Sequence, residues 1–390
     1  MKLDHLHAEL ADVLPEMIEL RHQIHQHPEL AYEEHATSDL VAARLEAWGY
    51  AVHRGLGGTG VVGQLKSGDG AKCIGIRADM DALPIAEDTG LPYASRHAGK
   101  MHACGHDGHT ATLLAAARHL ARTRRFDGTL NLIFQPAEEG AGGAKRMIDE
   151  GLFKRFPCDA VFALHNAPGQ AVGTLAFRSG AALASADKVS ITIKGKGGHA
   201  AMPQRSHDPI VAGSAIVMAL QTIVSRNIDP LDTAVITVGV FQSGVANNVI
   251  PATARLELSV RSLDREVRLK LKERIREVAM LQAQSFGVSA DVDWQDGYPV
   301  LVNTVEETHF AAQVALELLG ADKVVIDAPP VTGSEDFAFM LEHRPGCYLL
   351  LGNGDGEGSC MVHNPGYDFN DKAMATGAAY WSLLAERFLV

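Results

Sequence analysis

The chain of 390 residues is longer than one ordinary hydrophobic core supports, so its length predicts two domains. A composition of 46% hydrophobic and 21% charged residues is typical of a soluble globular protein, and a net charge of −12 without a Lys/Arg run argues against a nucleic-acid partner. The N-terminus lacks a signal peptide's apolar run, and we expect no stretch of membrane-spanning length. Five scattered cysteines outside any CxxC pattern favour reduced thiols, so we expect a cytoplasmic protein without a membrane partner.

The first part of the chain predicts helices that alternate with short apolar runs. Apolar side chains recur at helical spacing over residues 3–26, and Pro28 ends this helix because proline disfavours helical backbone at the residue before it. A second helix is predicted over 37–48, and two further helical stretches over 109–122 and 143–150. Helices between apolar runs favour an α/β arrangement.

Four apolar runs, three in this part and one near the C-terminus, each finish in polar residues. They are residues 73–77, 130–134, 160–164 and 346–351, followed in turn by Asp79 and Asp81, by Glu138 and Glu139, by His165 and Asn166, and by Gly352 and Asn353. Runs of this length between helices are typical of buried, mainly parallel strands. Ligands bind beyond the carboxyl ends of such strands, so we expect these polar residues to meet there.

Near residue 186 the pattern changes to that of a second domain. Its predicted elements are strands over 188–194, 233–242, 253–261 and 289–295 and helices over 208–225 and 264–284, with a glycine-rich turn at 195–199. The order β-α-β-β-α-β is that of a ferredoxin-like α+β domain. Helical α/β patterning returns at 304–319, so we expect residues 186–297 to be inserted into an α/β domain made of residues 1–185 and 298–390.

Residues 101–109 concentrate possible metal ligands. Three histidines, a cysteine and an aspartate lie within these nine residues, together with two glycines that permit tight turns. Thiolate, imidazole and carboxylate groups this close together favour a transition-metal site that includes Cys104 and His106. Two other interpretations stay open for this stretch alone. It could be a histidine-rich surface loop, or Cys104 could be a nucleophile with a histidine as its base.

Two glutamates and two histidines elsewhere could complete a metal site. Glu138 and Glu139 follow an apolar run, and adjacent side chains there diverge, so one can bind a metal while the other reaches a metal-bound water. With the cysteine and histidine above, one glutamate, His165 and His363 make five ligands, which suits two metals sharing a bridge better than one tetrahedral zinc. Taken singly, the glutamates could be a solvated turn and each histidine an ordinary hydrogen-bonding residue.

Five more residues are candidates for supporting or binding roles. Asp79 or Asp81 could accept the spare N–H of a ligand histidine and fix its tautomer, or could only cap a turn. His199 lies in a glycine-rich loop of the inserted domain. Asn248 and Arg261 border two of that domain's strands, and an amide and a guanidinium can bind a substrate carboxylate. Each of these last three could equally be a loop or surface residue.

With these motifs in place, the sequence resembles the M20 metallopeptidase family. Within it, the chain is similar to the amidohydrolase branch of hippurate hydrolases, N-acyl-amino-acid amidohydrolases (aminoacylases) and plant auxin-conjugate hydrolases. The resemblance rests on motifs spread in order over essentially the whole chain. They are Arg77-Ala-Asp-Met-Asp-Ala-Leu-Pro84, His102-Ala-Cys-Gly-His-Asp-Gly-His109, Phe134-Gln-Pro-Ala-Glu-Glu-Gly140, Leu164-His-Asn166, Gly198-His-Ala-Ala-Met-Pro203, Asn248-Val-Ile-Pro251, Gly333-Ser-Glu-Asp-Phe337 and His363-Asn-Pro-Gly366.

The resemblance implies a site for two divalent metal ions in each subunit. Cys104 would bridge the two metals, with Glu139 and His363 on one and His106 and His165 on the other. The thiolate bridge is compatible with Zn, Mn, Co or Ni. Most of the wider family has a His-x-Asp at the first strand end and an aspartate bridge, whereas the amidohydrolase branch shares the residues found here. That departure favours the branch over the aminopeptidases.

The resemblance also assigns roles in catalysis and substrate binding. Glu138 would be the general base on the bridging water, and Asp81 the supporting aspartate that the family treats as catalytic. The inserted domain would be a lid and dimer interface, and its His199 would reach the partner subunit's active site to polarise the scissile carbonyl. The residues expected to bind substrate are Asn248 and Arg261 at its carboxylate and Gly333 and Ser334 along the pocket.

The sequence therefore predicts a homodimeric, metal-dependent hydrolase of N-acyl amino acids. It would cleave the amide between an acyl or aroyl group and an amino acid, with hippurate-like and N-acetyl amino acids as leading substrates. The nearest alternative is a dipeptidase or aminopeptidase of the same family. Two more distant alternatives are an amidase with Cys104 as nucleophile and a non-enzymatic binding protein on a hydrolase scaffold.

Overall fold

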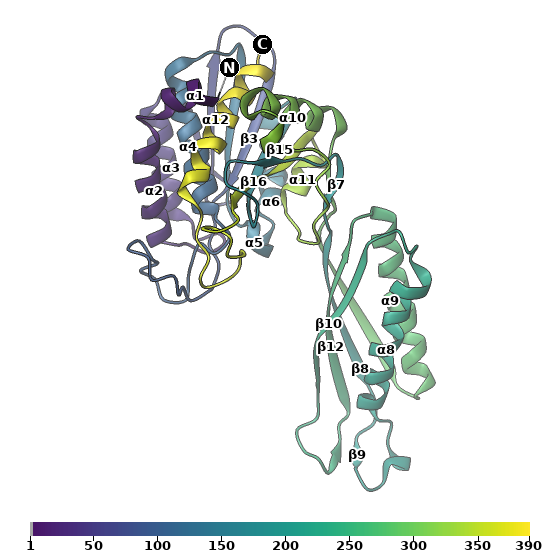
Figure 1. Ribbon diagram of the computed structural model, residues 1–390. Helices are drawn as coiled ribbons and strands as arrows, with labels where there is room; N and C mark the ends of the chain where they lie inside the picture. Colours follow the sequence, from purple (N-terminus) through teal and green to yellow (C-terminus); the bar gives the residue numbers. More distant parts are fainter. Residues whose placement is uncertain (1–2) are drawn as a thin grey trace. The chain divides into compact units, whose positions relative to one another are not determined.

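The computed structural model describes residues 3–390, which form two compact units (Figure 1). Unit 1 comprises Met1–Gly180, Val302–Pro329 and Asp336–Val390, and unit 2 comprises Ala181–Leu301 and Pro330–Glu335. The inserted unit thus begins five residues before the predicted 186 and ends four after the predicted 297. It also includes a short second segment that the sequence analysis assigned to the other domain. That segment belongs to unit 2 because Val331 N–H bonds to Ala182 O and Ala184 N–H to Gly333 O, both at 2.9 Å.

Unit 1 is built on an eight-stranded sheet in the order β1-β2-β4-β3-β5-β16-β6-β15. Its strands are β1 (Ala51–Leu56), β2 (Gly60–Ser67), β3 (Cys73–Asp79), β4 (Gly128–Gln135), β5 (Ala160–Pro168), β6 (Leu175–Ala176), β15 (Val324–Val325) and β16 (Gly346–Gly354). The four central strands, β4, β3, β5 and β16, pair in parallel. They contain the four predicted apolar runs, so the expected mainly parallel sheet is confirmed, and their carboxyl ends share one edge.

Helices pack around this sheet and form the main core with it. They are α1 (Leu3–Leu10), α2 (Leu14–Gln26), α3 (His35–Ala47), α4 (His106–Thr123), α5 (Glu138–Ala141), α6 (Gly143–Asp149), α7 (Leu152–Arg155), α10 (Val305–Leu319), α11 (Phe337–Leu341) and α12 (Asp371–Phe388), with a 3₁₀ turn at Ala321–Lys323. Helices α4 and α12 lie against each other and against β3, and small residues such as Ala116 and Ala378 are fully buried there. Close approach of these two helices fixes the start of α4, which carries the motif at 101–109.

Two details of unit 1 differ from the sequence prediction. The single helix expected over 3–26 is two helices, α1 and α2, because Pro15 occupies the first turn of α2. Proline has no N–H to donate and its ring clashes with the carbonyl four residues earlier, so a continuous helix cannot pass through it. Strand β5 continues past Leu164 to Pro168, because His165 and Asn166 still pair with β16.

Unit 2 is the predicted ferredoxin-like domain. Its elements are β8 (Ala186–Lys194), β9 (Gly198–His199), a 3₁₀ turn (Pro203–Arg205), α8 (Pro209–Asn227), β10 (Ala234–Ser243), β11 (Val249–Ile250), β12 (Thr253–Ser262), α9 (Arg265–Ser285) and β13 (Ser289–Tyr298). Two short paired strands, β7 (Gly180–Leu183) and β14 (Leu301–Asn303), span the points at which the chain passes from one unit to the other. The antiparallel sheet has the order β10-β12-β8-β13, and α8 and α9 contribute to its core with residues such as Ile216 and Leu271. The chain order β-α-β-β-α-β confirms the expected α+β insertion.

Helix α8 contradicts the expectation that no stretch reaches membrane-spanning length. By length and composition alone, its residues Pro209–Asn227 are long and apolar enough to cross a membrane. The side chains of Ile216, Leu220 and Ile223 are nevertheless buried in the core of unit 2. A core helix packed on a sheet meets the same length and composition test, so this single helix is weak evidence for a membrane span.

Candidate metal centre

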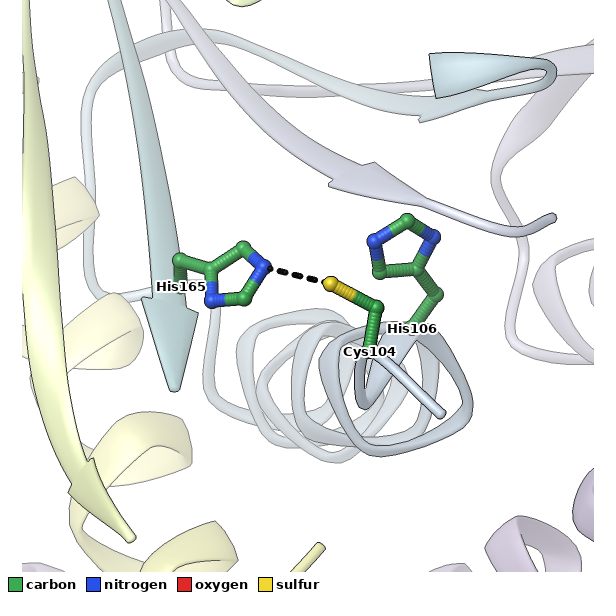
Figure 2. Close-up of side chains that lie close together, drawn as sticks. All are labelled: Cys104, His106 and His165. Atoms are coloured by element: carbon green, nitrogen blue, oxygen red, sulfur yellow. Dashed lines mark hydrogen bonds between the residues drawn. The ribbon is translucent and has the colours of Figure 1, made fainter. Parts of the chain in front are cut away.

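The carboxyl ends of the central strands in unit 1 bring all five predicted ligands together. Cys104 and His106 flank the start of α4, Glu139 lies in α5 just after β4, His165 lies in β5, and His363 lies in the loop after β16. Figure 2 shows the thiol of Cys104 directed at the ring of His165, with His106 beside them. The predicted convergence of polar strand ends therefore gathers residues that are up to 259 positions apart in the sequence.

Among the described residues, five groups of three possible ligand atoms have all their atoms within 4.8 Å of one another, and two of these groups contain Cys104. The first group is Cys104, His106 and His165, and the second is Cys104, Glu139 and His363. Cys104 Sγ lies 3.2 Å from His165 Nε2, and His363 Nε2 lies 3.1 Å from Glu139 Oε1. Two ligands of one tetrahedral zinc lie about 3.5 Å apart, so both distances fit metal coordination. The grouping matches the division that the family resemblance implies.

A glycine between Cys104 and His106 lets both side chains face the same site. Gly105 has a φ of +91°, and a Cβ there would lie 2.5 Å from both the Asn166 amide and the Tyr367 hydroxyl. The same amide donates to Cys104 O at 2.6 Å, and the Tyr367 hydroxyl donates to Asn166 Oδ1 at 2.6 Å. Only glycine combines this backbone conformation with so little space.

The two buried histidines of the first group differ in protonation: burial opposes a charge on His106, but Asp79 and Asp81 raise its pKa to about 10, so metal binding there would displace a proton. His165 Nδ1 donates to Asn166 O at 2.7 Å, which leaves the Nε2 lone pair facing Cys104. Burial and the nearby His109 lower the pKa of His165 to about 3, so its ring is neutral. Both ring nitrogens of the fully buried His106 face carboxylates, with Asp81 Oδ1 3.3 Å from Nδ1 and Asp79 Oδ2 3.7 Å from Nε2, but neither contact has hydrogen-bond geometry. The ring is therefore not committed to a hydrogen bond that a metal would have to break.

The thiol of Cys104 argues against the cysteine-nucleophile alternative. Burial, followed by the carboxylates of Glu139 and Glu138, raises the pKa of Cys104 well above its ordinary value. A nucleophilic cysteine needs the opposite environment, because the thiolate is the reactive form. A bound cation would reverse this balance by stabilising the thiolate directly. The surroundings of Cys104 therefore fit a bridging ligand rather than an unassisted nucleophile.

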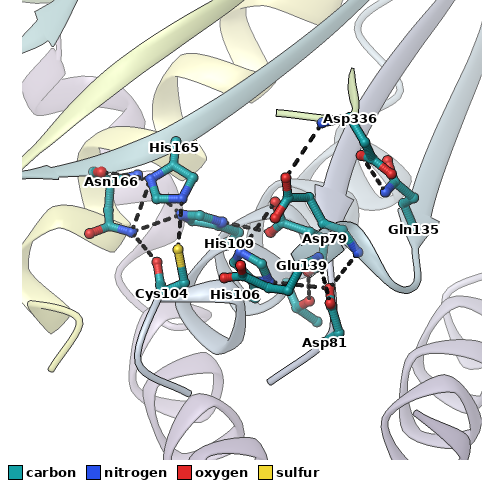
Figure 3. Close-up of polar contacts among 12 residues, drawn as sticks. Asp79, Asp81, Cys104, His106, His109, Gln135, Glu139, His165, Asn166 and Asp336 are labelled. Carbon is teal, nitrogen blue, oxygen red and sulfur yellow. Dashed lines mark hydrogen bonds and ion pairs between the residues drawn. The ribbon is translucent and has the colours of Figure 1, made fainter. Parts of the chain in front are cut away.

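Asp81 holds the two glutamates that follow β4. Its Oδ1 accepts the backbone N–H of Glu138 at 3.0 Å, and its Oδ2 accepts that of Glu139 at 2.9 Å (Figure 3). Oδ1 also lies 3.3 Å from His106 Nδ1. Asp81 thus links the backbone of one ligand to the ring of another, which is a more specific role than the turn cap considered from the sequence.

Glu138 is the glutamate of the pair that belongs to neither Cys104 group. It is 6% exposed, and its Oε1 accepts the backbone N–H of Asp336 at 3.4 Å. The Asp336 carboxylate is itself anchored, with Gln135 Nε2 at 2.8 Å, Arg77 Nη2 at 3.2 Å and the backbone N–H of Ala144 at 2.9 Å. Asp336 lies in one of the motifs of the family resemblance, but its sequence context predicts no role for it. The one feature of the sequence that could have indicated a buried partner such as Asp336 is the charged Arg77 inside an apolar run.

A second chain of contacts supports the site from Asp79. His109 Nδ1 lies 2.6 Å from Asp79 Oδ1, and His109 Nε2 accepts the backbone N–H of Asn166 at 3.0 Å. Although burial favours the neutral acid, His106 and Arg77 hold the pKa of Asp79 well below its ordinary value. Both nitrogens of His109 are therefore engaged, so this histidine supports the site and is not available as a metal ligand. The ring lies beside His165, as Figure 3 shows.

The five predicted residues of unit 2 fall into two separate places. His199 on β9 pairs with Val249 on β11, and Ala200 N–H bonds to Asn248 O at 3.1 Å, so His199 and Asn248 are neighbours. They lie near the start of β12, whereas Arg261 lies eight residues beyond Thr253 on that strand, roughly 25 Å away. Within one chain, Asn248 and Arg261 are therefore too far apart to contact one carboxylate together.

Arg261 lies instead beside the remaining two predicted residues. Its Nη1 donates to Thr332 O at 3.3 Å, next to Gly333 and Ser334. Arg261 is about half-buried, and this burial lowers the pKa of its guanidinium from the ordinary value. The structure thus groups Arg261 with Gly333 and Ser334, and His199 with Asn248.

Comparison with known proteins decides the family. The model of peptidase family M20/M25/M40 matches residues 75–387. The chain belongs to the M20 family. It is 45% identical to the hippurate hydrolase of Campylobacter jejuni subsp. jejuni over 381 residues, which covers 98% of each chain. It is also 40% identical to the N-acetyl-L-cysteine deacetylase of Bacillus subtilis, over 97% of this chain and 90% of that protein.

A solved structure extends the M20 comparison to three dimensions. The YXEP protein of Bacillus subtilis, a dinuclear metal-binding peptidase of the M20 family, matches with a TM-score of 0.84 and 34% identity. The match covers 96% of this chain and 98% of that one. The M20 fold expected from the sequence motifs is therefore confirmed for both units.

Proposed function

We propose that this M20 chain, a metal-dependent amidohydrolase, cleaves the amide bond of N-acyl amino acids such as hippurate and N-acetyl amino acids. The products would be the carboxylic acid and the free amino acid. One observation carries the proposal: two ligand groups share Cys104, and a buried glutamate outside both groups, Glu138, lies beside them. The similarity to a hippurate hydrolase and to an N-acetyl-L-cysteine deacetylase supports the substrate class.

The residues fit a two-metal site, and each has a defined task. When bound, two divalent metals would polarise the scissile carbonyl and lower the pKa of the attacking water. Cys104, His106, Glu139, His165 and His363 are the residues that would hold them. Glu138 accepts the proton of the water and returns it to the leaving amine nitrogen, so the reaction consumes one water and leaves the glutamate unchanged. Asp81 keeps both glutamates in place through their backbone.

His199 is suited to donate a hydrogen bond to the scissile carbonyl. Its Nδ1 accepts the backbone N–H of Ala201 at 3.0 Å, so the neutral ring carries its proton on Nε2. A donor aimed at the carbonyl oxygen stabilises the charge that develops there as water attacks. His199 and Asn248 lie at one end of the unit 2 sheet and Arg261 at the other, so one chain cannot direct all three at one small substrate. This separation supports a homodimer in which the first two residues act in the partner's site and Arg261 acts in its own.

The substrate contacts follow from this division. Arg261 presents a guanidinium beside Gly333 and Ser334, and a guanidinium can hold the free carboxylate of the amino-acid product through paired hydrogen bonds. Asn248 would add an amide from the partner subunit. A cytoplasmic location is part of the proposal and rests on the pattern of scattered cysteines.

Glu138→Gln tests the role of the base. The variant keeps the shape of the side chain but cannot accept a proton, so we expect kcat on hippurate to fall about 10³-fold with both metals retained. Metal content is measured by mass spectrometry on the same samples, and Glu46→Gln, on the exposed face of α3, is the matched control. Full activity of Glu138→Gln would exclude it as the base. Faster hydrolysis of dipeptides with free amines than of N-acyl amino acids would favour the dipeptidase alternative.

Mixed dimers test the partner arrangement. In a hybrid dimer, one chain carries His199→Ala and the other carries Glu138→Ala. If His199 acts across the interface, the chain with intact Glu138 receives an intact His199 from its partner, so one of the two sites is complete. We expect activity to reappear when the two inactive variants are unfolded, mixed and refolded together. Absence of activity in hybrids that are shown to form would mean that His199 does not act in the partner's site.

A further inference from the structure

Ala137, the residue directly before the two glutamates, has left-handed backbone. Its φ and ψ are +56° and 44°, and its side chain is fully buried. For a residue other than glycine this conformation is disfavoured and persists only where its surroundings hold it. The turn at Ala137 joins the end of β4 to α5, so its conformation sets the direction in which Glu138 and Glu139 leave the strand.

A buried carboxylate far away in the sequence holds this turn. Glu34 Oε1 accepts the backbone N–H of Ala137 at 2.9 Å and that of Tyr32 at 3.0 Å. Its Oε2 accepts the hydroxyl of Thr59 at 2.5 Å. Glu34 has no solvent exposure, and a buried carboxylate is retained only when hydrogen bonds compensate for its desolvation. These contacts supply that compensation from three separate segments of unit 1.

The contacts of Glu34 are not those of a helix cap. Glu34 occupies the N-cap position of α3, yet in the described structure its side chain makes no capping bond to that helix. Its carboxylate is directed instead to Ala137, Tyr32 and Thr59. The helix alone therefore gives no reason for an acid at this position.

Glu34 and Asp81 together bind three consecutive backbone N–H groups. Ala137 donates to Glu34, and the next two residues, Glu138 and Glu139, donate to the two oxygens of Asp81. Successive N–H groups that point to one side form a concavity that binds anionic oxygens. Here two buried carboxylates fill it, and the segment they hold carries one metal ligand and the general base.

We propose that Glu34 is a positioning residue that holds the left-handed Ala137 peptide and thereby directs Glu138 and Glu139 to the metal centre. The inference rests on the proposed function, because it gives Glu138 the role of base. Glu34 touches neither substrate nor metal in this arrangement, and it acts only through the backbone of Ala137.

Rescue by glycine separates positioning from general stability. Glu34→Met fills the same volume without accepting a hydrogen bond, so we expect kcat on hippurate to fall 10- to 100-fold while KM changes less than threefold and two metals remain bound. Glycine adopts left-handed backbone without support. Adding Ala137→Gly to Glu34→Met should therefore raise kcat at least fivefold above that of Glu34→Met alone. The double variant gains no hydrogen bond, so this rise would come from the backbone at residue 137.

Two control variants change the surroundings or the charge of Glu34 but leave its hydrogen bond with the Ala137 N–H in place. Glu34→Gln retains an oxygen for the N–H groups of Ala137 and Tyr32, and Thr59→Val removes only the partner of the other oxygen. Both should keep kcat within threefold of the unmodified enzyme, even if their melting temperatures fall. Glu34→Asp is a milder variant that replaces Glu34→Met if the latter does not fold. Its shorter side chain should lower kcat about fivefold, and Ala137→Gly should again raise kcat.

The possible results separate this inference from the proposed function. Unchanged kcat in Glu34→Met or Glu34→Asp, or no rescue by Ala137→Gly, would overturn the positioning role. A loss in Thr59→Val as large as in Glu34→Met would also overturn it, because that bond does not involve Ala137. If Glu138→Gln is inactive while Glu34→Met keeps its kcat, only the positioning role fails. If Glu138→Gln is fully active, the proposed base fails whatever Glu34 does.

Discussion

The two ligand groups of the metal centre differ sharply in how the protein supports them. His106, in the inner group, is completely buried, with Asp79 and Asp81 oxygens 3.7 and 3.3 Å from its ring nitrogens. In the outer group, the side chain of His363 is 51% exposed and that of Glu139 13%. His363 also has left-handed backbone, held by one bond from its N–H to Ala103 O at 2.7 Å.

This difference indicates that the two metal positions are not equivalent. Ligands whose orientation is fixed by surrounding hydrogen bonds bind metal more tightly, and loss of such a partner typically weakens binding 10- to 100-fold. In the inner group, His165 is held by a hydrogen bond to Asn166 O and the His106 ring faces two buried carboxylates, whereas the outer group depends on a loop residue in a strained conformation. We therefore expect the inner position to retain its metal when the outer one has lost it.

The largest effect is expected at the residue that both groups share. Cys104→Ala removes one ligand from each metal position, so both metals should be lost and kcat should fall more than about 10³-fold. Metal content by mass spectrometry and hydrolysis of hippurate are measured together, with Cys73→Ala as the control at a half-buried cysteine outside the site. Two metals in purified Cys104→Ala would exclude the bridging role.

A smaller effect is expected from a change confined to the outer group. His363→Ala should leave one metal per chain instead of two and lower kcat about 10²-fold, because the inner ligands are intact. His343→Ala, at an exposed position, is the control. In the unmodified enzyme, increasing chelator concentration should remove the two metals in two steps. His363→Ala should show only the step that needs the higher chelator concentration. Equal loss of both metals would mean that the two positions have the same affinity.

The smallest effect concerns the support behind the inner group. His25 on α2 is fully buried between Asp107, 2.9 Å away, and Glu87, 3.3 Å away. Burial opposes protonation, but Asp107 outweighs it and raises the pKa of His25 from 6.5 to about 9. Because the folded pKa lies above the unfolded one, the stabilisation is complete below about pH 6.5 and is lost as the pH rises through 9.

Denaturation at two pH values measures this contribution. The difference in free energy of unfolding between the unmodified protein and His25→Gln should be about 3 kcal/mol smaller at pH 9.5 than at pH 6. His22→Gln, on the same helix but partly exposed, is the control variant. A difference for His25→Gln that does not change with pH would show that this histidine is not charged in the folded protein.

The sequence predicted the parts of the site that depend on strand order. The four apolar runs with polar ends are the four central parallel strands, and this placement sets Asp81, Glu139 and His165 at one edge of the sheet. The inserted unit was also predictable, because alternating strands such as 188–194 differ plainly from buried parallel ones. Pro15 was a visible signal for the break between α1 and α2 that the helical periodicity obscured.

Other parts of the site depend on contacts that leave no pattern in the sequence. The role of Asp336 and the contact of Glu34 with Ala137 both involve backbone N–H groups, which every residue except proline offers. Nothing marks Ala137 as left-handed, because alanine is not a residue that adopts this conformation readily. Asn248 likewise lies near the start of β12 and Arg261 near its end, and a set of motifs does not give this separation.

The raised pKa of Cys104 has a consequence for the enzyme without its metals. Oxidation of cysteine follows thiolate character and exposure, and here burial and the neighbouring carboxylates favour the protonated thiol of a residue that is only 7% exposed. Loss of metal therefore does not leave a reactive thiolate that air or peroxide would rapidly convert to a sulfenic or sulfinic acid. We expect a chain starved of metal to remain chemically intact and to recover its activity when divalent metal returns.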